Sequence, residues 1–129
     1  MNFAAIGLGS FGTKRAQSIK NSKLSKLVSI FDPNSENAEK AKKILDTPIV
    51  EYEKILADKS IDVICICAPN KFHKDIIIES LRAGKHVFCE KPITRNFKEA
   101  QEIYEIAKNS KNILQVGSNH RFFESVLFA

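Results

Sequence analysis

The sequence predicts an α/β fold built on a doubly wound parallel sheet, and two observations support this prediction. Short apolar runs rich in β-branched residues alternate with amphipathic stretches along all 129 residues. The runs are almost continuously hydrophobic, which is typical of strands that helices cover on both faces of a sheet. A chain of this length is expected to form one domain with its own core.

About six segments carry the strand pattern, and the third of them is the weakest. In chain order they cover residues 3–6, 26–31, 48–50, 63–68, 86–89 and 113–116. Parallel strands joined by right-handed crossovers favour the strand order 3-2-1-4-5-6, which is that of a Rossmann fold with helices on both faces.

Five amphipathic stretches separate these runs and place apolar residues at helical spacing. They cover residues 10–21, 35–45, 52–57, 71–83 and 97–109. In the fourth stretch Phe72, Ile76 and Leu81 lie on the inner face. Gly84 follows where helices commonly end on a glycine, so we expect that helix to stop there.

The distribution of charge argues against nucleic-acid binding. Lysine and arginine outnumber aspartate and glutamate by 20 to 15, which gives a net charge of +5. The lysines are dispersed along the predicted helices, for example at Lys40, Lys98 and Lys108, and no dense basic run contains interleaved aromatic residues. We therefore expect solvated helix faces and no nucleic-acid partner.

Neither a metal site nor a membrane segment is expected. Cys65 and Cys67 lie two residues apart and Cys89 stands alone, which is not the spacing of a zinc or redox pair. No basic region precedes the first apolar stretch, as it would in a signal peptide. No apolar run approaches the ~18 residues that span a bilayer. Buried thiols in a reducing compartment therefore favour a cytoplasmic protein.

A glycine-rich turn links the first predicted strand to the first predicted helix, and it reads GLGSFG over residues 7–12. In a dinucleotide site Gly7 would permit the tight turn, Gly9 would let the backbone approach a pyrophosphate, and Gly12 would let helix and strand pack closely. Ser10 and Phe11 open a helix whose first turns carry no acidic residue, so its free N–H groups are available to an anion. The alternative is a purely structural turn.

Asp32 ends the second predicted strand, 20 residues beyond Gly12. A dinucleotide site places an acidic residue there to bind the adenosine ribose hydroxyls. The alternative is a helix cap, because Asp32 followed by Pro33 resembles an N-cap with proline at the first helical position. We favour the ribose role because the spacing and the strand end agree.

Asp32 also bears on the choice of cofactor. A carboxylate that faces a 2′-phosphate would cost on the order of several kcal/mol through like-charge contact. No arginine follows in residues 33–37 to bind such a phosphate. The sequence therefore predicts NAD in preference to NADP.

Four segments together resemble a known family. They are GLGSFG at residues 7–12, APNKFH at 68–73, GKHVFCEKP at 84–92 and GSNHRF at 117–122. In order and spacing they resemble the N-terminal half of the Gfo/Idh/MocA oxidoreductases, over essentially the whole chain. This resemblance implies an enzyme that moves a hydride between NAD(P) and a carbinol or carbonyl carbon of a sugar, cyclitol or related substrate.

The resemblance assigns the catalytic role to Lys91, beside the nicotinamide and the reacting oxygen of the substrate. Hydride loss from an alcohol carbon must be matched by proton loss from its oxygen, and a positioned amine can accept that proton. Desolvation and the cationic ring would both disfavour the ammonium. Glu90 either holds the nicotinamide side of the cofactor or orients Lys91, and Pro92 fixes the turn through a cis bond. The structural alternative is an exposed Glu90–Lys91 pair at a strand end.

Further cofactor contacts are implied for Ala68, Asn70, His73, Asn119 and Arg121, all in the matched segments. Alternatives remain open for three of them. Asn70 reaches the nicotinamide ribose or caps the next helix. His73 faces the cofactor or is a first-turn helix residue without a chemical task. Arg121 lies near the nicotinamide or is a structural ion-pair partner.

Domain organisation is expected to depart from the family pattern. We interpret residues 1–120 as the NAD(P)-binding domain and residues 121–129 as the start of a connection to a missing substrate domain. The ending FFESVLF is apolar and would be an association liability if exposed. We therefore expect a truncated piece of a longer enzyme, inactive alone, whose sugar-like substrate binds through the missing domain and which can form a homo-oligomer.

The sequence leaves two other functions as alternatives. A stand-alone NAD(H)-binding module would sense or scaffold without catalysing. A Rossmann methyltransferase has a similar glycine loop, but the EKP at residues 90–92 argues against it.

Overall fold

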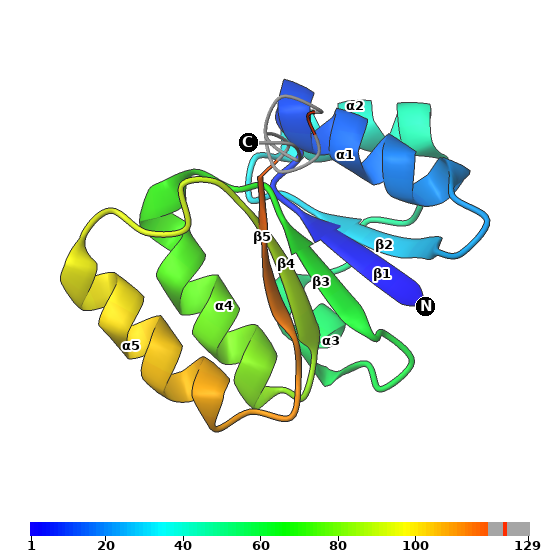
Figure 1. Ribbon diagram of the computed structural model, residues 1–129. Coiled ribbons are helices and arrows are strands. Elements are labelled where there is room, and N and C mark those ends of the chain that lie inside the picture. Colours follow the sequence, from blue (N-terminus) through cyan, green and yellow to red (C-terminus); the bar gives the residue numbers. More distant parts are fainter. Residues whose placement is uncertain (119–122, 124–129) are drawn as a thin grey trace.

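A five-stranded, all-parallel sheet forms the centre of the computed structural model, which describes residues 1–118 and 123 (Figure 1). The strand order is β2-β1-β3-β4-β5, so the chain starts in the sheet interior, passes to one edge and then crosses to the other. The strands are β1 (Asn2–Ile6), β2 (Lys26–Phe31), β3 (Val63–Ile66), β4 (His86–Glu90) and β5 (Leu114–Gly117). This arrangement confirms the predicted doubly wound α/β fold.

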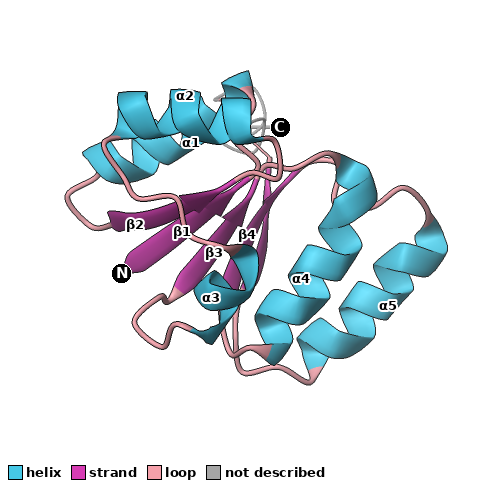
Figure 2. Ribbon diagram, turned by 180° about the vertical axis from the view of Figure 1, so that it is seen from behind, coloured by secondary structure: helices cyan, strands magenta, loops and turns pink. Residues whose placement is uncertain are grey.

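Helices cover both faces of the sheet, as Figures 1 and 2 show from opposite sides. They are α1 (Ser10–Asn21), α2 (Ser35–Leu45), α3 (Tyr52–Ala57), the short 3₁₀ turn η1 (Asn70–Phe72), α4 (His73–Arg82) and α5 (Phe97–Lys108). One apolar layer joins the sheet to α1 and α2 through residues such as Ala16 and Leu45. A second layer joins it to α3, α4 and α5 through residues such as Ile55, Ile77 and Ile103.

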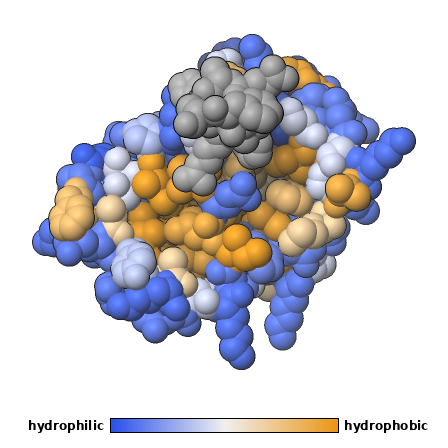
Figure 3. Space-filling view, viewed as in Figure 1, coloured by the Kyte–Doolittle hydropathy of each residue, from blue (hydrophilic) through white to orange (hydrophobic). Residues whose placement is uncertain are grey.

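Strand β3 shows why the apolar runs are continuous. Ile64 and Ile66 point into one layer and Cys65 into the other, and none of the three has measurable exposure. A strand buried on both faces needs apolar residues at every position rather than at every second one. Edge strand β5 differs from β3, because apolar side chains around it reach the molecular surface on the face that Figure 3 shows.

The third predicted strand is wrong as a strand. Residues 48–50 make a single parallel bridge, between Ile30 and Ile49, on the outer side of β2. Ile30 donates to the Pro48 carbonyl and Val50 donates to the Ile30 carbonyl, both at 3.0 Å. Proline has no N–H to extend the ladder, and α3 begins two residues after the bridge segment. The segment nevertheless lies where the predicted order puts the third strand.

Helix boundaries follow the sequence closely, with one local difference. The predicted ranges 10–21, 35–45 and 52–57 are confirmed, whereas 71–83 divides into η1 and α4. Gly84 follows with φ of +77°, the left-handed conformation that favours glycine after a helix. In the part of the chain that is described, no helix combines the length and apolarity needed to cross a membrane.

Lys85 has a structural role within the GKHVFCEKP segment. Its side chain is buried, and Nζ donates to the carbonyl oxygens of Asp58 and Ile61 at 2.5 and 3.0 Å. The ammonium therefore ties the start of β4 to the loop between α3 and β3.

Replacing this ammonium should destabilise the fold without touching the carboxyl edge of the sheet. We expect Lys85→Met to lower the free energy of unfolding by about 1–3 kcal/mol, because buried carbonyl groups lose a charged donor. Urea denaturation measures the effect, and Lys59→Met, at an exposed position of the same loop, is the matched control. Equal stability of the two variants would contradict the structural role of Lys85.

Candidate functional site

Two cavities meet at the carboxyl ends of the strands, where the chain switches from one half of the sheet to the other. The first, called the Asp32 cavity, has a volume of about 650 Å³. The second, called the Lys91 cavity, has a volume of about 680 Å³. Cys67 and Ala68, just beyond β3, line both. The two cavities therefore form one groove along the rim, at the topological switch point where open α/β sheets bind ligands.

The glycines of the turn have separate roles. Gly7 has φ of +86°, and a Cβ there would lie 2.4 Å from the backbone nitrogen of Ala68. A Cβ on Gly12 would lie 1.9 Å from the Gly7 carbonyl oxygen. A Cβ on Gly9 would meet nothing within 4 Å and would enter the Asp32 cavity, which Gly9 lines. Gly7 and Gly12 thus permit close packing, and Gly9 keeps space open for a ligand.

The amino end of α1 points at the junction of the cavities. Its N-cap is Gly9, no side chain caps it, and its first turn contains no acidic residue, as predicted. The first i→i−4 hydrogen bond of α1 runs from the Thr13 N–H to the Gly9 carbonyl oxygen at 2.9 Å. The N–H groups of Ser10 and Phe11 precede it and have no helical partner. Ser10 and Gly12 line neither cavity, whereas Phe11 lines the Lys91 cavity.

Asp32 links the end of β2 to the glycine turn. One carboxylate oxygen accepts from the Leu8 N–H at 2.6 Å and the other accepts from the Asn34 N–H at 2.8 Å. The capping alternative for Asp32 is wrong, because the N-cap of α2 is Asn34, whose side chain accepts from the Asn37 N–H at 3.1 Å. Asp32 instead lines the cavity that carries its name.

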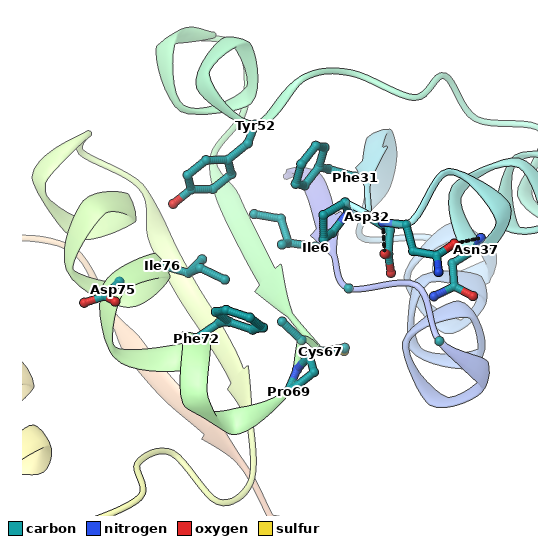
Figure 4. A pocket seen from close by; sticks show the side chains of 15 residues that line it. Ile6, Phe31, Asp32, Asn37, Tyr52, Cys67, Pro69, Phe72, Asp75 and Ile76 are labelled. Carbon is teal, nitrogen blue, oxygen red and sulfur yellow. Dashed lines mark hydrogen bonds between the residues drawn. The ribbon is translucent and has the colours of Figure 1, made fainter.

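Apolar and aromatic side chains form most of the rest of the Asp32 cavity (Figure 4). The rings of Phe31 and Tyr52 lie 5.9 Å apart, and Phe72 is 46% exposed across the same space. The Tyr52 hydroxyl donates to a Glu79 carboxylate oxygen at 2.6 Å, and burial together with this hydrogen bond raises the pKa of Tyr52. The described lining of the Asp32 cavity contains two carboxylates, Asp32 and Asp75, and no lysine or arginine.

Lys91 lies at the mouth of the second cavity. Its side chain is exposed and has no hydrogen-bond or ion-pair partner among residues 1–118 and 123. The Lys91–Pro92 peptide bond is cis, as the family resemblance implied. Asn70 lines the same cavity, and its side chain caps neither η1 nor α4. Two polar side chains therefore line this space without a hydrogen-bond or ion-pair partner in the part of the chain that is described.

His73 joins two loops beneath the Lys91 cavity. The side chain is only 2% exposed, with Nδ1 3.0 Å from the Pro92 carbonyl oxygen and Nε2 2.7 Å from the Ala68 carbonyl oxygen. Both ring nitrogens therefore lie within hydrogen-bond distance of a backbone carbonyl oxygen, and a neutral ring donates to one of the two. The cofactor contact of His73 stays a prediction, and the observed role is to hold the turn after β4 against the end of β3.

Arg15 lines neither cavity but binds Glu90, which lines the Lys91 cavity, and the sequence did not predict this contact. Its Nε and Nη2 donate to Oε1 of Glu90 at 2.8 and 2.5 Å. Its guanidinium lies 5.5 Å from the ring centre of Phe11 and 5.3 Å from that of Phe88. Glu90 is thus paired with Arg15 across 75 residues of sequence rather than with its neighbour Lys91. The only local signal was the i, i+4 spacing of Phe11 and Arg15.

Two predicted site residues cannot be located, and the predictions about metal ligands and cysteines concern described residues. Asn119 and Arg121 lie outside the described residues, although Gly117 and Ser118 just before them line the Lys91 cavity. Within the described ranges no cluster of three or more metal-ligating side chains occurs. Burial raises the pKa of the Cys89 thiol to about 12, so Cys89 stays protonated at neutral pH.

Comparison with known proteins identifies relatives of this chain. The model of an oxidoreductase family with an NAD-binding Rossmann fold, Gfo/Idh/MocA, matches residues 1–118. A myo-inositol 2-dehydrogenase of Thermotoga maritima is 30% identical over 124 residues, which are 95% of this chain and 37% of that protein. A 2,7-anhydro-N-acetylneuraminate hydratase of Escherichia coli is 27% identical over 130 residues, covering 100% of this chain and 34% of that protein.

Solved structures agree. The crystal structure of myo-inositol 2-dehydrogenase from Lactobacillus plantarum superposes with a TM-score of 0.89 at 33% identity, covering 99% of this chain and 39% of that one. The chain therefore spans about a third of the length of the relatives that it matches.

The glycine geometry makes a prediction about stability. Gly12→Ala should lower the free energy of unfolding by at least about 3 kcal/mol, because its Cβ would overlap a backbone oxygen that cannot move aside. Gly9→Ala should change it by less than about 0.5 kcal/mol, because that Cβ enters open space. Urea denaturation of both variants measures the difference. Similar stability of the two would show that the turn packs less closely than described.

Proposed function

This chain belongs to the Gfo/Idh/MocA family of oxidoreductases as their NAD-binding Rossmann domain, and on that premise we propose that its rim groove binds one extended NAD molecule for hydride transfer in the whole protein. The observation that carries the proposal is the continuity of the two cavities across Cys67 and Ala68. An extended dinucleotide needs two neighbouring half-sites with a phosphate-binding turn between them.

The adenosine half is assigned to the Asp32 cavity. Its apolar and aromatic side chains suit a base, and the Asp32 carboxylate suits the ribose hydroxyls at the end of β2. The diphosphate then lies over Gly9, where no side chain intrudes, at the positive end of α1. The nicotinamide half is assigned to the Lys91 cavity, where the Asn70 side chain, which has no partner among residues 1–118 and 123, is available to bind it and Lys91 is left for the substrate.

NAD is preferred over NADP in this proposal. A 2′-phosphate beside Asp32 would meet a carboxylate, with a second carboxylate at Asp75 in the same cavity. The described lining supplies no cation to offset the repulsion. Asn34 and Asn37, which also line the cavity, are neutral.

Lys91 is the proposed acid–base group. When bound, the nicotinamide ring supplies the acceptor or donor of the hydride. As a neutral amine, Lys91 Nζ accepts the proton that an alcohol oxygen loses as its carbon gives up hydride, and as an ammonium it returns that proton in the reverse direction. The cis bond at Pro92 and the His73 contacts hold the turn from which Lys91 projects.

Sugars or cyclitols are the proposed substrates of the whole protein. This choice rests on the family resemblance and on the relatives named as inositol dehydrogenases. The relative named as a hydratase makes net hydration of a sugar derivative a second candidate. Formation of NADH from NAD with a candidate polyol distinguishes oxidation from hydration, which gives no net NADH.

Binding to this chain tests the cofactor proposal directly. NADH should bind saturably, and Asp32→Ala should weaken binding at least about tenfold, because charge-assisted hydrogen bonds to the ribose are lost. NAD should compete better than NADP, and Asp32→Ala should narrow that preference. Fluorescence titration of NADH measures both effects.

Glu39→Ala is the control for that experiment, since Glu39 is an exposed carboxylate on α2 that lines neither cavity. An Asp32→Ala chain that folds and binds NADH as tightly as the control would remove Asp32 from the site. Tighter binding of NADP than of NAD would overturn the electrostatic argument.

The role of Lys91 is tested in the full-length protein. Lys91→Ala should lower kcat by about 100-fold or more, as loss of a general acid–base group does, while the Kd for NADH changes by less than about threefold. Lys98→Ala, an exposed lysine on α5, should leave both unchanged. Steady-state kinetics and NADH titration give the two numbers. Undiminished turnover of Lys91→Ala would remove Lys91 from the chemical step.

A further inference from the structure

A charged cluster borders the Lys91 cavity and has no part in the function proposed above. It consists of Arg15, the carboxylate of Glu90 and the rings of Phe11 and Phe88, and we call it the Arg15 cluster. Glu90 and Phe11 line the cavity itself. Glu90 is 8% exposed, so its charge would be costly without the guanidinium beside it.

The pairing within the cluster is asymmetric. Both guanidinium nitrogens donate to Oε1 of Glu90, at 2.8 and 2.5 Å. Oε2 accepts no hydrogen bond from residues 1–118 and 123. One oxygen therefore anchors Glu90, which lines the cavity, to Arg15, and the pair does not use the other oxygen.

The cluster is held in place from several sides. Two aromatic rings flank the guanidinium, which restricts where its charge can lie. Gly117 of β5 lies beneath the pair, since a Cβ there would be 2.9 Å from Phe88 Cζ and 3.2 Å from Glu90 Cδ. The positive charge of Arg15 is thus fixed next to Glu90, whereas the exposed Lys91 side chain has no partner among residues 1–118 and 123.

We propose that Arg15 is a positioning residue that neutralises Glu90 and thereby sets the relative affinity of the site for oxidised and reduced nicotinamide. This inference rests on the proposed placement of the nicotinamide in the Lys91 cavity. The oxidised ring carries a positive charge and the reduced ring is neutral. A fixed charge beside the ring therefore changes the binding of one form more than the other.

The sign of each perturbation follows from the pair. Without Arg15, the carboxylate of Glu90 faces the cavity alone and favours the cationic NAD⁺. Without the Glu90 charge, the guanidinium of Arg15 remains and favours neutral NADH. With both charges removed, the balance returns toward that of the intact pair.

Four variants of the chain test this assignment: Arg15→Gln, Glu90→Gln, the double variant and Arg15→Lys. Calorimetry gives the Kd for NAD⁺ and fluorescence titration gives the Kd for NADH. We expect Arg15→Gln to shift the ratio of the two constants about tenfold toward NAD⁺ and Glu90→Gln about tenfold toward NADH. Each shift equals about 30 mV in the potential of the bound two-electron couple. The double variant and Arg15→Lys should stay within about threefold of wild type.

ADP-ribose separates this effect from general damage to the groove, because it lacks the nicotinamide ring. It should bind wild type and Arg15→Gln equally. Equal losses of ADP-ribose, NAD⁺ and NADH affinity would make Arg15 merely structural and would overturn the inference. A ratio in Glu90→Gln that stays at the wild-type value would overturn it independently, even where Arg15→Gln does not fold.

The same data distinguish failure of the Arg15 role from failure of the proposed NAD site. If NAD⁺ and NADH both bind tightly and the ratio of their Kd values is unchanged in the variants, the role of Arg15 is wrong and the proposed function stands. No binding of NAD⁺, NADH or ADP-ribose to the wild-type chain sinks both.

Discussion

The close backbone contact at Gly7 and Gly12 is the constraint on which the rest of the rim depends. Because Gly12 has no side chain, α1 can start directly above the end of β1, and because Gly7 has none, the turn can lie against Ala68. Asp32 then holds the turn from the other side by accepting from the Leu8 N–H. The helix end, the acidic strand end and the floor of both cavities are placed by this one contact.

The groove that results has two electrostatically different ends. The described lining at the Asp32 end contains carboxylates without cations, whereas the Lys91 end contains both signs of charge, with Glu90 already paired to Arg15. An asymmetric ligand with a neutral ribose at one end and a ring of variable charge at the other matches this division. The same asymmetry would fit a symmetric or uniformly anionic ligand poorly.

Periodicity and local signals in the sequence sufficed for most of the fold but not for the site. The apolar run of β3 and the glycine that follows α4 depend only on neighbouring residues, so this strand and this helix end could be predicted. The prediction of a third strand was wrong because Pro48 has no N–H to donate to a sheet ladder, which hydrophobic periodicity does not reflect. The Arg15–Glu90 pair joins residues 75 apart, and the His73 contacts depend on where two loops meet. No local pattern encodes such distances.

The bridging imidazole at the base of the second cavity has a mechanical consequence. With one nitrogen on the Ala68 carbonyl and the other on that of Pro92, the two crossover loops cannot separate without losing a contact at residue 73. The lysine-bearing turn is therefore not an independent flap. A shift of that turn would therefore disturb its contact with the Ala68 carbonyl through the imidazole, and Ala68 lines both cavities.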